Sequence, residues 1–224
     1  MFYTLVLLAL VGVVQAAPAG IDVSGWQGEV DWATVKAGGV EFAYIKATEG
    51  TTYKNPYFAQ QYVGSFNQSI IHGGYHFARP DSSSGAAQAT FFAENGGGWS
   101  ADGMTLPGSL DIEYNPDGDT CYGLSQSDMV SWISDFSNTY QSLTTRYPVI
   151  YSTTNWWTTC TGNSADFAST NPLWIARYSS EVGTLPAGWE FYTIWQYSDS
   201  ASPIGGDANY FNGDSDGLKR LALG

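Results

Sequence analysis

The chain has 224 residues, a length that fits one large domain or two small ones. Asp and Glu total 21 against 8 Lys and Arg, so the formal net charge is −13 and the isoelectric point is about 4.2. This excess of acidic residues argues against a nucleic-acid partner, because binding to phosphates requires clustered basic charge. Aromatic residues make up 16% of the chain and charged residues only 13%, which excludes a disordered protein and fits a cleft that stacks on sugar rings.

The first sixteen residues have the features of a secretory signal peptide. Residues 1–16 carry no charged side chain, Leu5–Val14 is an apolar run of suitable length, and Val14-Gln15-Ala16 resembles a small-x-small cleavage site. No later stretch approaches the roughly 18 apolar residues that a membrane span requires. We therefore expect a secreted, extracellular protein with a mature chain of residues 17–224, which acts as a monomer and has no membrane partner.

From Gly20 onward, short apolar runs alternate with segments that have helical periodicity. The predicted strands are Gly20–Gly25, Phe42–Ala47, Ile70–Ala78, a run from Pro107 that ends in Asp111 and Glu113, Pro148–Ser152, Leu173–Tyr178, Phe191–Tyr197 and Asn209–Phe211. The predicted helices are Asp31–Ala37 with Asp31 as N-cap, Pro56–Phe66, Gly85–Glu94, Ser125–Leu143, a short helix at Ser164–Ser169, and Asp214–Leu221.

Repeated strand–helix units predict a parallel sheet. Because about five such units precede strands that lack helical crossovers, we predict an α/β fold: a single-domain, irregular TIM-like β/α barrel. In such barrels the chemistry takes place at the C-terminal ends of the strands. Glu113, His76 and Tyr178 all lie near predicted strand ends and are therefore candidate site residues.

The two cysteines, Cys121 and Cys160, follow the fourth and fifth predicted strands. An even number of cysteines in an oxidising compartment predicts a disulfide bond. This bond would join two neighbouring loops on the face that carries the candidate site. The alternative is a pair of buried free thiols.

The fourth predicted strand ends in two acidic side chains, Asp111 and Glu113, separated by Ile112. Side chains alternate along a strand, so both carboxylates point to one face, with α-carbons roughly 6–7 Å apart. Their repulsion raises the pKa of whichever is drier, so one can hold a proton while the other stays charged. This arrangement suits acid–base cleavage of a glycosidic bond, and the alternative is a solvated pair at a strand end.

Seven segments, in order from Gly20 to Gly213, together resemble glycoside hydrolase family 25, the muramidases or lysozymes built on an irregular β/α barrel. The matching segments are Gly20-Ile21-Asp22-Val23-Ser24 with Gln27, Lys46-Ala47-Thr48-Glu49-Gly50, Gly74-Tyr75-His76-Phe77, Asp111-Ile112-Glu113, Trp174-Ile175-Ala176-Arg177-Tyr178, Trp195-Gln196-Tyr197 and Asp207-Ala208-Asn209-Tyr210-Phe211-Asn212-Gly213. Each segment is weak alone, but their common order covers nearly the whole mature chain and makes the resemblance specific.

The resemblance implies four acidic site residues. Glu113 matches the general acid that protonates the leaving oxygen, and Asp111 matches a partner that positions the substrate's 2-acetamido group or stabilises positive charge. Asp22 and Asp207 would flank the cleft. An unpaired carboxylate inside an apolar strand is costly, which also favours a function for Asp22, whereas Asp207 in a glycine-rich loop is compatible with simple turn chemistry.

Four further residues are candidate sugar contacts. The resemblance implies Tyr75 and Trp195, while His76 and Tyr178 are candidates from their positions near strand ends. His76 is equally compatible with a hydrogen-bonded core histidine, and Lys46 is a candidate charge partner for the carboxylates. We expect no metal or organic cofactor, because no third ligand at a recognisable spacing accompanies the two histidines.

The resemblance implies a muramidase that cuts the β-1,4 bond between N-acetylmuramic acid and N-acetylglucosamine in bacterial peptidoglycan. One alternative is a chitinase-like glycosidase, although Pro107-Gly108-Ser109-Leu110 replaces the longer acidic run that usually precedes its acidic pair. Another is a non-catalytic cell-wall sugar-binding protein, which has little reason to bury several like charges together. The carboxylates are compatible with direct displacement and with a route in which the substrate's acetamide is the nucleophile.

Overall fold

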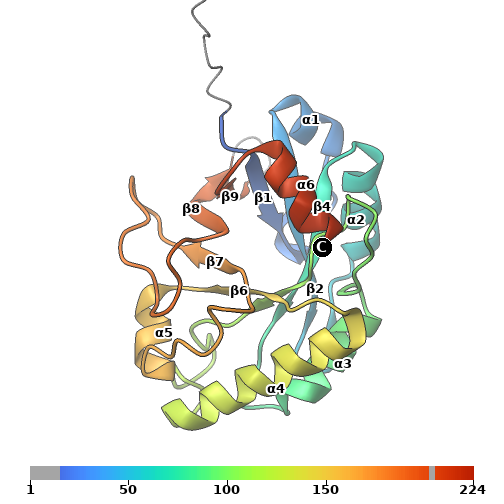
Figure 1. The fold of residues 1–224 in the computed structure, drawn as a ribbon. Coiled ribbons are helices and arrows are strands. Elements are labelled where there is room, and N and C mark those ends of the chain that lie inside the picture. The colour runs from blue at the N-terminus through green and yellow to red at the C-terminus, as the bar shows by residue number, and fades with distance from the viewer. Residues whose placement is uncertain (1–15, 202–204) are drawn as a thin grey trace, which may run out of the picture.

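Strands and helices alternate through most of the computed structural model, which describes residues 16–201 and 205–224 (Figure 1). The predicted signal peptide lies almost entirely outside these residues. The strands are β1 (Ala19–Val23), β2 (Val40–Glu49), β3 (Tyr53–Lys54), β4 (Ile71–Phe77), β5 (Ser109–Asp111), β6 (Val149–Ser152), β7 (Leu173–Ala176), β8 (Ile194–Ala201) and β9 (Gly206–Phe211). The helices are α1 (Trp32–Ala37), α2 (Phe58–Asn67), α3 (Gly85–Glu94), α4 (Gln126–Thr144), α5 (Thr154–Thr161) and α6 (Ser215–Leu223), with a 3₁₀ turn at Gly25–Gln27.

Eight strands close into a barrel in the order β1-β9-β8-β7-β6-β5-β4-β2, and β2 pairs back to β1. The two-residue β3 lies outside this ring as a hairpin on β2. Five strand–helix units, from β1–α1 to β6–α5, precede β7, β8 and β9, which have no helices between them. The prediction of an irregular β/α barrel is therefore confirmed. Its irregularity has two parts: the parallel strands β7 and β8 are joined without a helix, and β9 runs antiparallel between β1 and β8 and needs no helical crossover.

Helix starts follow the capping residues that the sequence contains. Asp31 caps α1 by accepting a hydrogen bond from the Thr34 backbone N–H, as predicted. Ser84 and Ser125 cap α3 and α4 in the same way, and α3 has the bounds that its pattern predicts. These caps satisfy backbone N–H groups that have no partner inside the helix.

The prediction of a short helix at Ser164–Ser169 is wrong. The helix between β6 and β7 is α5, and residues 166–170 form turns instead. The Thr-rich sequence of α5 has low intrinsic helix propensity, but burial of Trp156, Trp157 and Cys160 overrides that preference.

Three buried apolar clusters hold the barrel, and one of them, which includes Val23, Val35 and Ile45, joins β1 and β2 to helix α1. The outer layer lies between the strands and helices α3, α4 and α5, and includes Phe92, Phe136 and Trp157. The layer inside the barrel contains Phe42, Tyr44, Leu106, Trp174 and Phe211. This inner layer fills the barrel interior, as in other small barrels, so that a cleft is left at one end.

Helix α6 closes the end of the barrel at which the parallel strands begin. It follows β9, and its Leu218 and Ala222 are buried in the inner apolar layer. Figure 1 shows α6 in front of the strands in this view. The opposite end of the barrel, where the parallel strands finish, remains for the candidate site.

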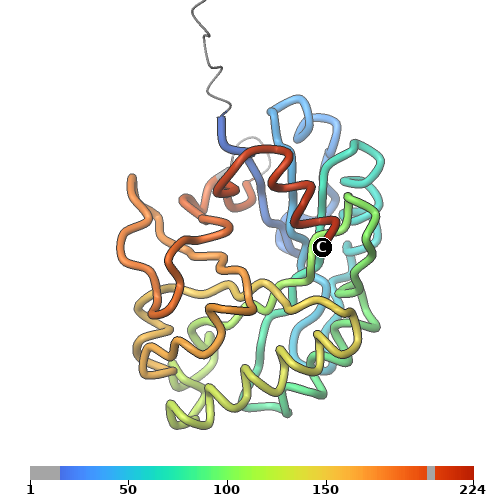
Figure 2. Tube along the Cα trace, viewed as in Figure 1, coloured from blue at the N-terminus to red at the C-terminus, as the bar shows by residue number. Residues whose placement is uncertain are grey.

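Helices α3 and α4 run side by side along the outside of the barrel (Figure 2). Gly85 begins α3 where a Cβ atom would lie only 2.3 Å from the Trp132 carbonyl oxygen of α4. A glycine at this point therefore permits the close approach of the two helix backbones. None of the helices in the described residues is long and apolar enough to cross a membrane.

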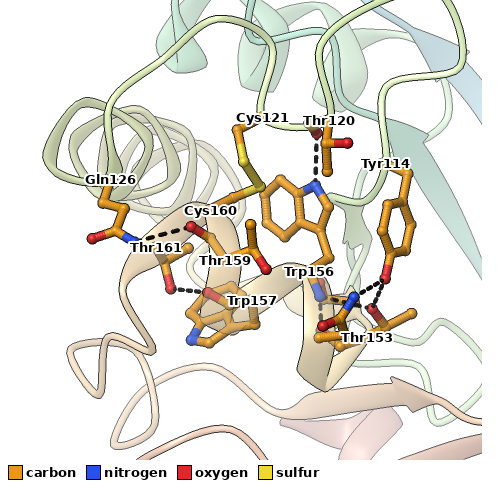
Figure 3. The surroundings of a disulfide bond; sticks show 12 residues. Tyr114, Thr120, Cys121, Gln126, Thr153, Trp156, Trp157, Thr159, Cys160 and Thr161 are labelled. Carbon is orange, nitrogen blue, oxygen red and sulfur yellow. Dashed lines mark hydrogen bonds between the residues drawn. A yellow bond between two sulfur atoms is a disulfide. The ribbon is translucent and has the colours of Figure 1, made fainter.

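A disulfide joins Cys121 and Cys160, as the sequence predicts. Cys121 follows β5, and Cys160 lies within α5 rather than in the loop that we expected. Figure 3 shows the indole of Trp156 beside this bond, and its Nε1 donates to the Thr120 carbonyl oxygen at 3.0 Å. The bond thus fixes the segment that leaves the candidate site to a helix packed on the barrel.

We expect no free thiol when the protein is titrated under denaturing conditions without reductant. On the chain-entropy model, closing a loop with a sequence separation of 39 residues stabilises the fold by about 3–4 kcal/mol. Reduction, or the double change Cys121→Ala and Cys160→Ala, should therefore lower the melting temperature. Detection of two thiols in the unreduced protein would contradict the bond.

Candidate active site

A cleft of about 180 Å³ opens where the parallel strands finish. Its charged lining consists of the carboxyl groups of Asp22, Asp111, Glu113 and Asp207 and the ammonium group of Lys46. Aromatic rings, one amide and one hydroxyl group complete its walls, namely Trp26, Tyr75, Phe77, Tyr151, Trp174, Gln196 and Ser24. The structure therefore brings the four predicted acidic residues and Tyr75 together in one place.

Asp111 and Glu113 reach the cleft from the end of β5. The backbone remains extended past the strand, since the N–H of Ile112 donates to the Tyr151 carbonyl oxygen at 3.1 Å. Ile112 is buried in the outer apolar layer, so its two neighbours face the barrel interior. Alternation thus places both carboxyl groups on the cleft side.

Burial dominates the ionisation of this pair. Desolvation raises the pKa of Glu113 to about 7, the Asp207 charge adds to the rise, and Lys46 opposes it. Desolvation also raises the pKa of Asp111 well above its usual value, and the charge of Glu113 acts in the same direction. At mildly acidic pH the pair therefore retains a proton that a free carboxyl group would have released.

Asp111 also has an unused hydrogen-bonding atom. Its side chain is only 7% exposed, and its buried Oδ1 has no hydrogen-bond partner among the described residues. An unpaired buried acceptor is costly, and a ligand N–H or O–H group would relieve that cost.

Asp22 and Asp207 form the second carboxyl pair. They lie opposite each other in the β1–β9 ladder, where the barrel closes. Desolvation and the Asp207 charge raise the pKa of Asp22 to about 8. Desolvation also raises the pKa of Asp207, so the pair holds a proton near neutral pH.

Two amides hold the second pair in place. Gln196 Nε2 donates to Asp22 Oδ2 at 3.0 Å and to Asp207 Oδ2 at 3.1 Å. Asn209 Nδ2 donates to the same Asp22 oxygen at 2.7 Å. Both donors stabilise the ionised form of Asp22, but burial has the larger effect.

Neighbouring aromatic side chains set the direction of these amides. Gln196 Oε1 accepts hydrogen bonds from the hydroxyl groups of Tyr151 at 2.9 Å and Tyr178 at 3.1 Å. Trp174 Nε1 donates to Asn209 Oδ1 at 2.8 Å. With both amide oxygens occupied in this way, the amide nitrogens face the carboxyl groups.

Lys46 is itself held from outside the cleft. Its Nζ lies 2.7 Å from Glu49 Oε2, and the other Glu49 oxygen lies 3.3 Å from Arg79 Nη1. Arg79 also pairs with Asp117 at 2.7 Å, in the loop that follows Glu113. Glu49 is therefore part of an ion-pair chain that links Lys46 to this loop.

Two candidate sugar contacts lie outside the cleft. His76 is fully buried, and its ring nitrogens are 2.8 Å from Thr48 Oγ1 and 2.9 Å from Gln88 Oε1. It is thus the hydrogen-bonded core histidine that the sequence also allowed. Trp195 faces the outer layer and donates from Nε1 to the Arg177 carbonyl oxygen. We no longer assign either residue to sugar binding.

Tyr178 lies beside the cleft rather than in it. It lines an adjoining hollow together with Tyr114 and Arg177, and this hollow shares Glu113 and Tyr151 with the cleft. The hydroxyl group of Tyr178 also donates a hydrogen bond to Gln196, so Tyr178 is connected to the carboxyl cluster through the Gln196 amide.

Sequence reasoning missed Tyr151, Trp174, Gln196 and Trp26 as cleft residues. The sequence did contain a signal for Gln196, because a polar residue inside an apolar strand requires a buried hydrogen-bond partner. For metals, no group of three or more His, Cys, Asp or Glu side chains within the described ranges is placed to hold an ion.

Comparison with known proteins decides the family. The model of glycosyl hydrolases family 25 matches residues 21–206, which include three of the four carboxyl residues, Asp22, Asp111 and Glu113, and end one residue before Asp207. The chain belongs to glycosyl hydrolases family 25. This family 25 chain is therefore a glycoside hydrolase, as the sequence resemblance implies.

Known lysozymes and muramidases are similar over most of this chain. Lysozyme M1 of Streptomyces globisporus is 52% identical over 91% of this chain and 70% of its own length. N,O-diacetylmuramidase of a Chalaropsis species is 50% identical over 92% of this chain and 99% of its own. The muramidase structure from Acremonium alcalophilum superposes with a TM-score of 0.91 at 63% identity, over 92% and 99% of the two chains.

The raised carboxyl pKa values of Asp22 and Glu113 predict a contribution to stability that is full below about pH 4 and is lost as pH rises to about 8. Asp22 and Glu113 keep protons in the folded state that they lose in the unfolded state, so their contribution disappears as pH rises through about 7 to 8. The pKa values of His72 and His76 are lowered to about 4 by burial, so both are neutral in the folded state at these pH values, and in the unfolded state they lose most of their protons by about pH 7.5.

We therefore expect the free energy of unfolding to fall between pH 6.5 and 8.5, and Asp22→Asn to reduce that fall by about 1 kcal/mol per pH unit below pH 8. Denaturant unfolding at several pH values measures the free energy of unfolding of both proteins. Asp119→Asn, which removes the same formal charge from an exposed position, is the matched control. Equal pH slopes for the wild type and Asp22→Asn would show that Asp22 is not a buried, protonated group.

Proposed function

We propose that this chain is a muramidase that hydrolyses the β-1,4 bond between N-acetylmuramic acid and N-acetylglucosamine in bacterial peptidoglycan. The observation that carries the proposal is the Asp111–Glu113 pair, two buried carboxyl groups with raised pKa values at the end of one barrel strand. The similar proteins named as lysozymes and muramidases support the choice of substrate.

Glu113 acts as the general acid in this proposal. Its carboxyl group is protonated below about pH 7 and lines the open cleft, where it can give the proton to the leaving glycosidic oxygen. After the leaving group departs, the resulting carboxylate can accept a proton from water. Proton transfer in both directions requires a pKa near the working pH, which burial supplies here.

Asp111 positions the substrate. Its unpartnered Oδ1 fits the N–H of a 2-acetamido group, which both sugars of the substrate carry. When ionised, Asp111 also stabilises the positive charge that develops on the sugar ring as the bond breaks. Asp22 and Asp207 border the same reacting centre, held by Gln196.

We further propose that the protein is secreted and acts on the cell wall as a monomer. The uncharged, apolar segment at residues 1–16 supports secretion. The proposed reaction requires two carboxyl groups and water, and it needs no metal ion or organic cofactor.

Glu113→Gln should reduce the rate of cell-wall lysis by at least about 10²–10⁴-fold, because the amide keeps the shape but cannot donate the proton. Loss of turbidity of bacterial cell walls measures the rate, with chitin as a parallel substrate. Glu190→Gln makes the same chemical change at an exposed position outside the cleft and should leave lysis unaltered. Near-normal lysis by Glu113→Gln would remove Glu113 from the role, and preferential cleavage of chitin would favour a chitinase.

Cell-wall lysis should be fastest on the acid side of neutrality. Glu113 loses its proton as pH rises through about 7, and a chain of net charge −13 is repelled by an anionic cell wall. Added salt should recover the part of the loss that repulsion causes, but not the part that ionisation causes.

A pH–rate profile at two ionic strengths, run beside a small neutral substrate, separates the two effects. The small substrate should show the acid optimum without the salt effect. An optimum at or above pH 7.5 on both substrates would contradict the assignment of Glu113 as the acid.

A further inference from the structure

Trp26 is the most exposed large apolar side chain in the described residues, at 95% exposure. It lies at the rim of the cleft, in the 3₁₀ turn that follows β1. A large ring left in water forgoes the free energy that its burial would provide. Because Trp26 lines the cleft as well as being exposed, its ring is available to contact a ligand there.

The backbone that carries Trp26 is firmly held. Ser24 and Gln27 form a reciprocal cap around the turn, with Ser24 N–H donating to Gln27 Oε1 at 2.8 Å. Gln61 of α2 is fully buried and donates to the carbonyl oxygens of Ser24 at 2.8 Å and Gly28 at 2.7 Å. The ring is thus presented to solvent from a fixed base.

The cleft continues past Trp26 into a second hollow of about 310 Å³. The two spaces share Ser24, Trp26 and Lys46. Tyr53, 40% exposed on the hairpin strand β3, and Pro56 line the far side of this second hollow. On the other side of the carboxyl groups, the Tyr114–Tyr178 hollow of about 290 Å³ adjoins the cleft.

The carboxyl cluster is therefore in the middle of a continuous groove, with an exposed aromatic surface at each end. In the Trp26 hollow, the charges of Lys46 and Glu49 pair with each other at 2.7 Å. A hollow with paired charges and aromatic walls suits a neutral ring with apolar C–H faces better than a charged peptide.

We propose that Trp26 and Tyr53 form a binding subsite for an additional sugar ring of the glycan strand, beyond the two sugars that flank the bond to be cut. This inference rests on the proposed muramidase function and extends it, because it identifies the ligand as a polysaccharide at least one ring longer than the reacting disaccharide. Trp26 stacks on the ring, and Tyr53 borders it from the hairpin.

Trp26→Ala should raise KM for peptide-free glycan strands by about tenfold, the effect of losing one aromatic stacking contact, and leave kcat nearly unchanged. With a chromogenic glycoside of the disaccharide alone, the same change should raise KM much less than it does with strands. Trp26→Phe should restore most of the affinity for strands. Phe191→Ala, which removes a 66% exposed ring outside the groove, is the matched control.

A binding measurement separates this inference from the function itself. Calorimetric titration of Glu113→Gln with N-acetylglucosamine oligomers should show affinity that rises from the dimer to longer oligomers, and Trp26→Ala in that background should abolish the rise. If length dependence survives the loss of Trp26, the subsite is wrong even where cell walls are cleaved. A KM effect confined to strands that still carry peptides would assign the hollow to peptide and overturn the sugar proposal.

Discussion

The constraint on which this structure depends is the burial of four carboxyl groups at one end of a small barrel. Taking several like charges out of water is costly, and the protein meets the cost with retained protons and oriented amides rather than with cations. Gln196 donates to both Asp22 and Asp207, while Tyr151 and Tyr178 occupy its oxygen. Trp174 belongs to the inner apolar layer and also donates to Asn209 in this network. The packing of the barrel interior therefore also determines where the carboxyl groups lie.

Lys46 is the one cation among the described residues that line the cleft, and its charge favours the ionised forms of the nearby carboxyl groups. It lowers the pKa values of both Asp111 and Glu113, against the larger effect of burial. The Lys46 ammonium group also forms an ion pair with Glu49, which in turn pairs with Arg79. A fully available cation would favour ionised carboxylates, so the pairing outside the cleft helps Glu113 to keep a proton near neutral pH.

Features that depend on local periodicity could be predicted from the sequence, but the face that β4 and β8 turn toward the barrel interior could not. The helices α1, α3 and α4 and the strand–helix alternation follow from capping residues and apolar spacing. Whether Trp195 or Gln196 lines the cleft depends on which face of β8 meets the barrel interior. Both faces of a barrel strand are buried, so hydrophobic alternation does not distinguish them. The same ambiguity made His76 a candidate although it faces the outer layer.

The antiparallel strand β9 is the departure from regular β/α alternation that shapes the active site. A parallel strand brings its C-terminal end to the active face, whereas an antiparallel strand brings its N-terminal end there. Asp207, the second residue of β9, therefore lies opposite Asp22 near the C-terminal end of β1, and the ladder that closes the barrel also creates the second carboxyl pair. A helical crossover followed by a parallel strand would place the residue after the turn at the far end, beside α6. Loss of regular alternation in the last third of the chain is thus the geometric condition for having Asp207 in the cleft.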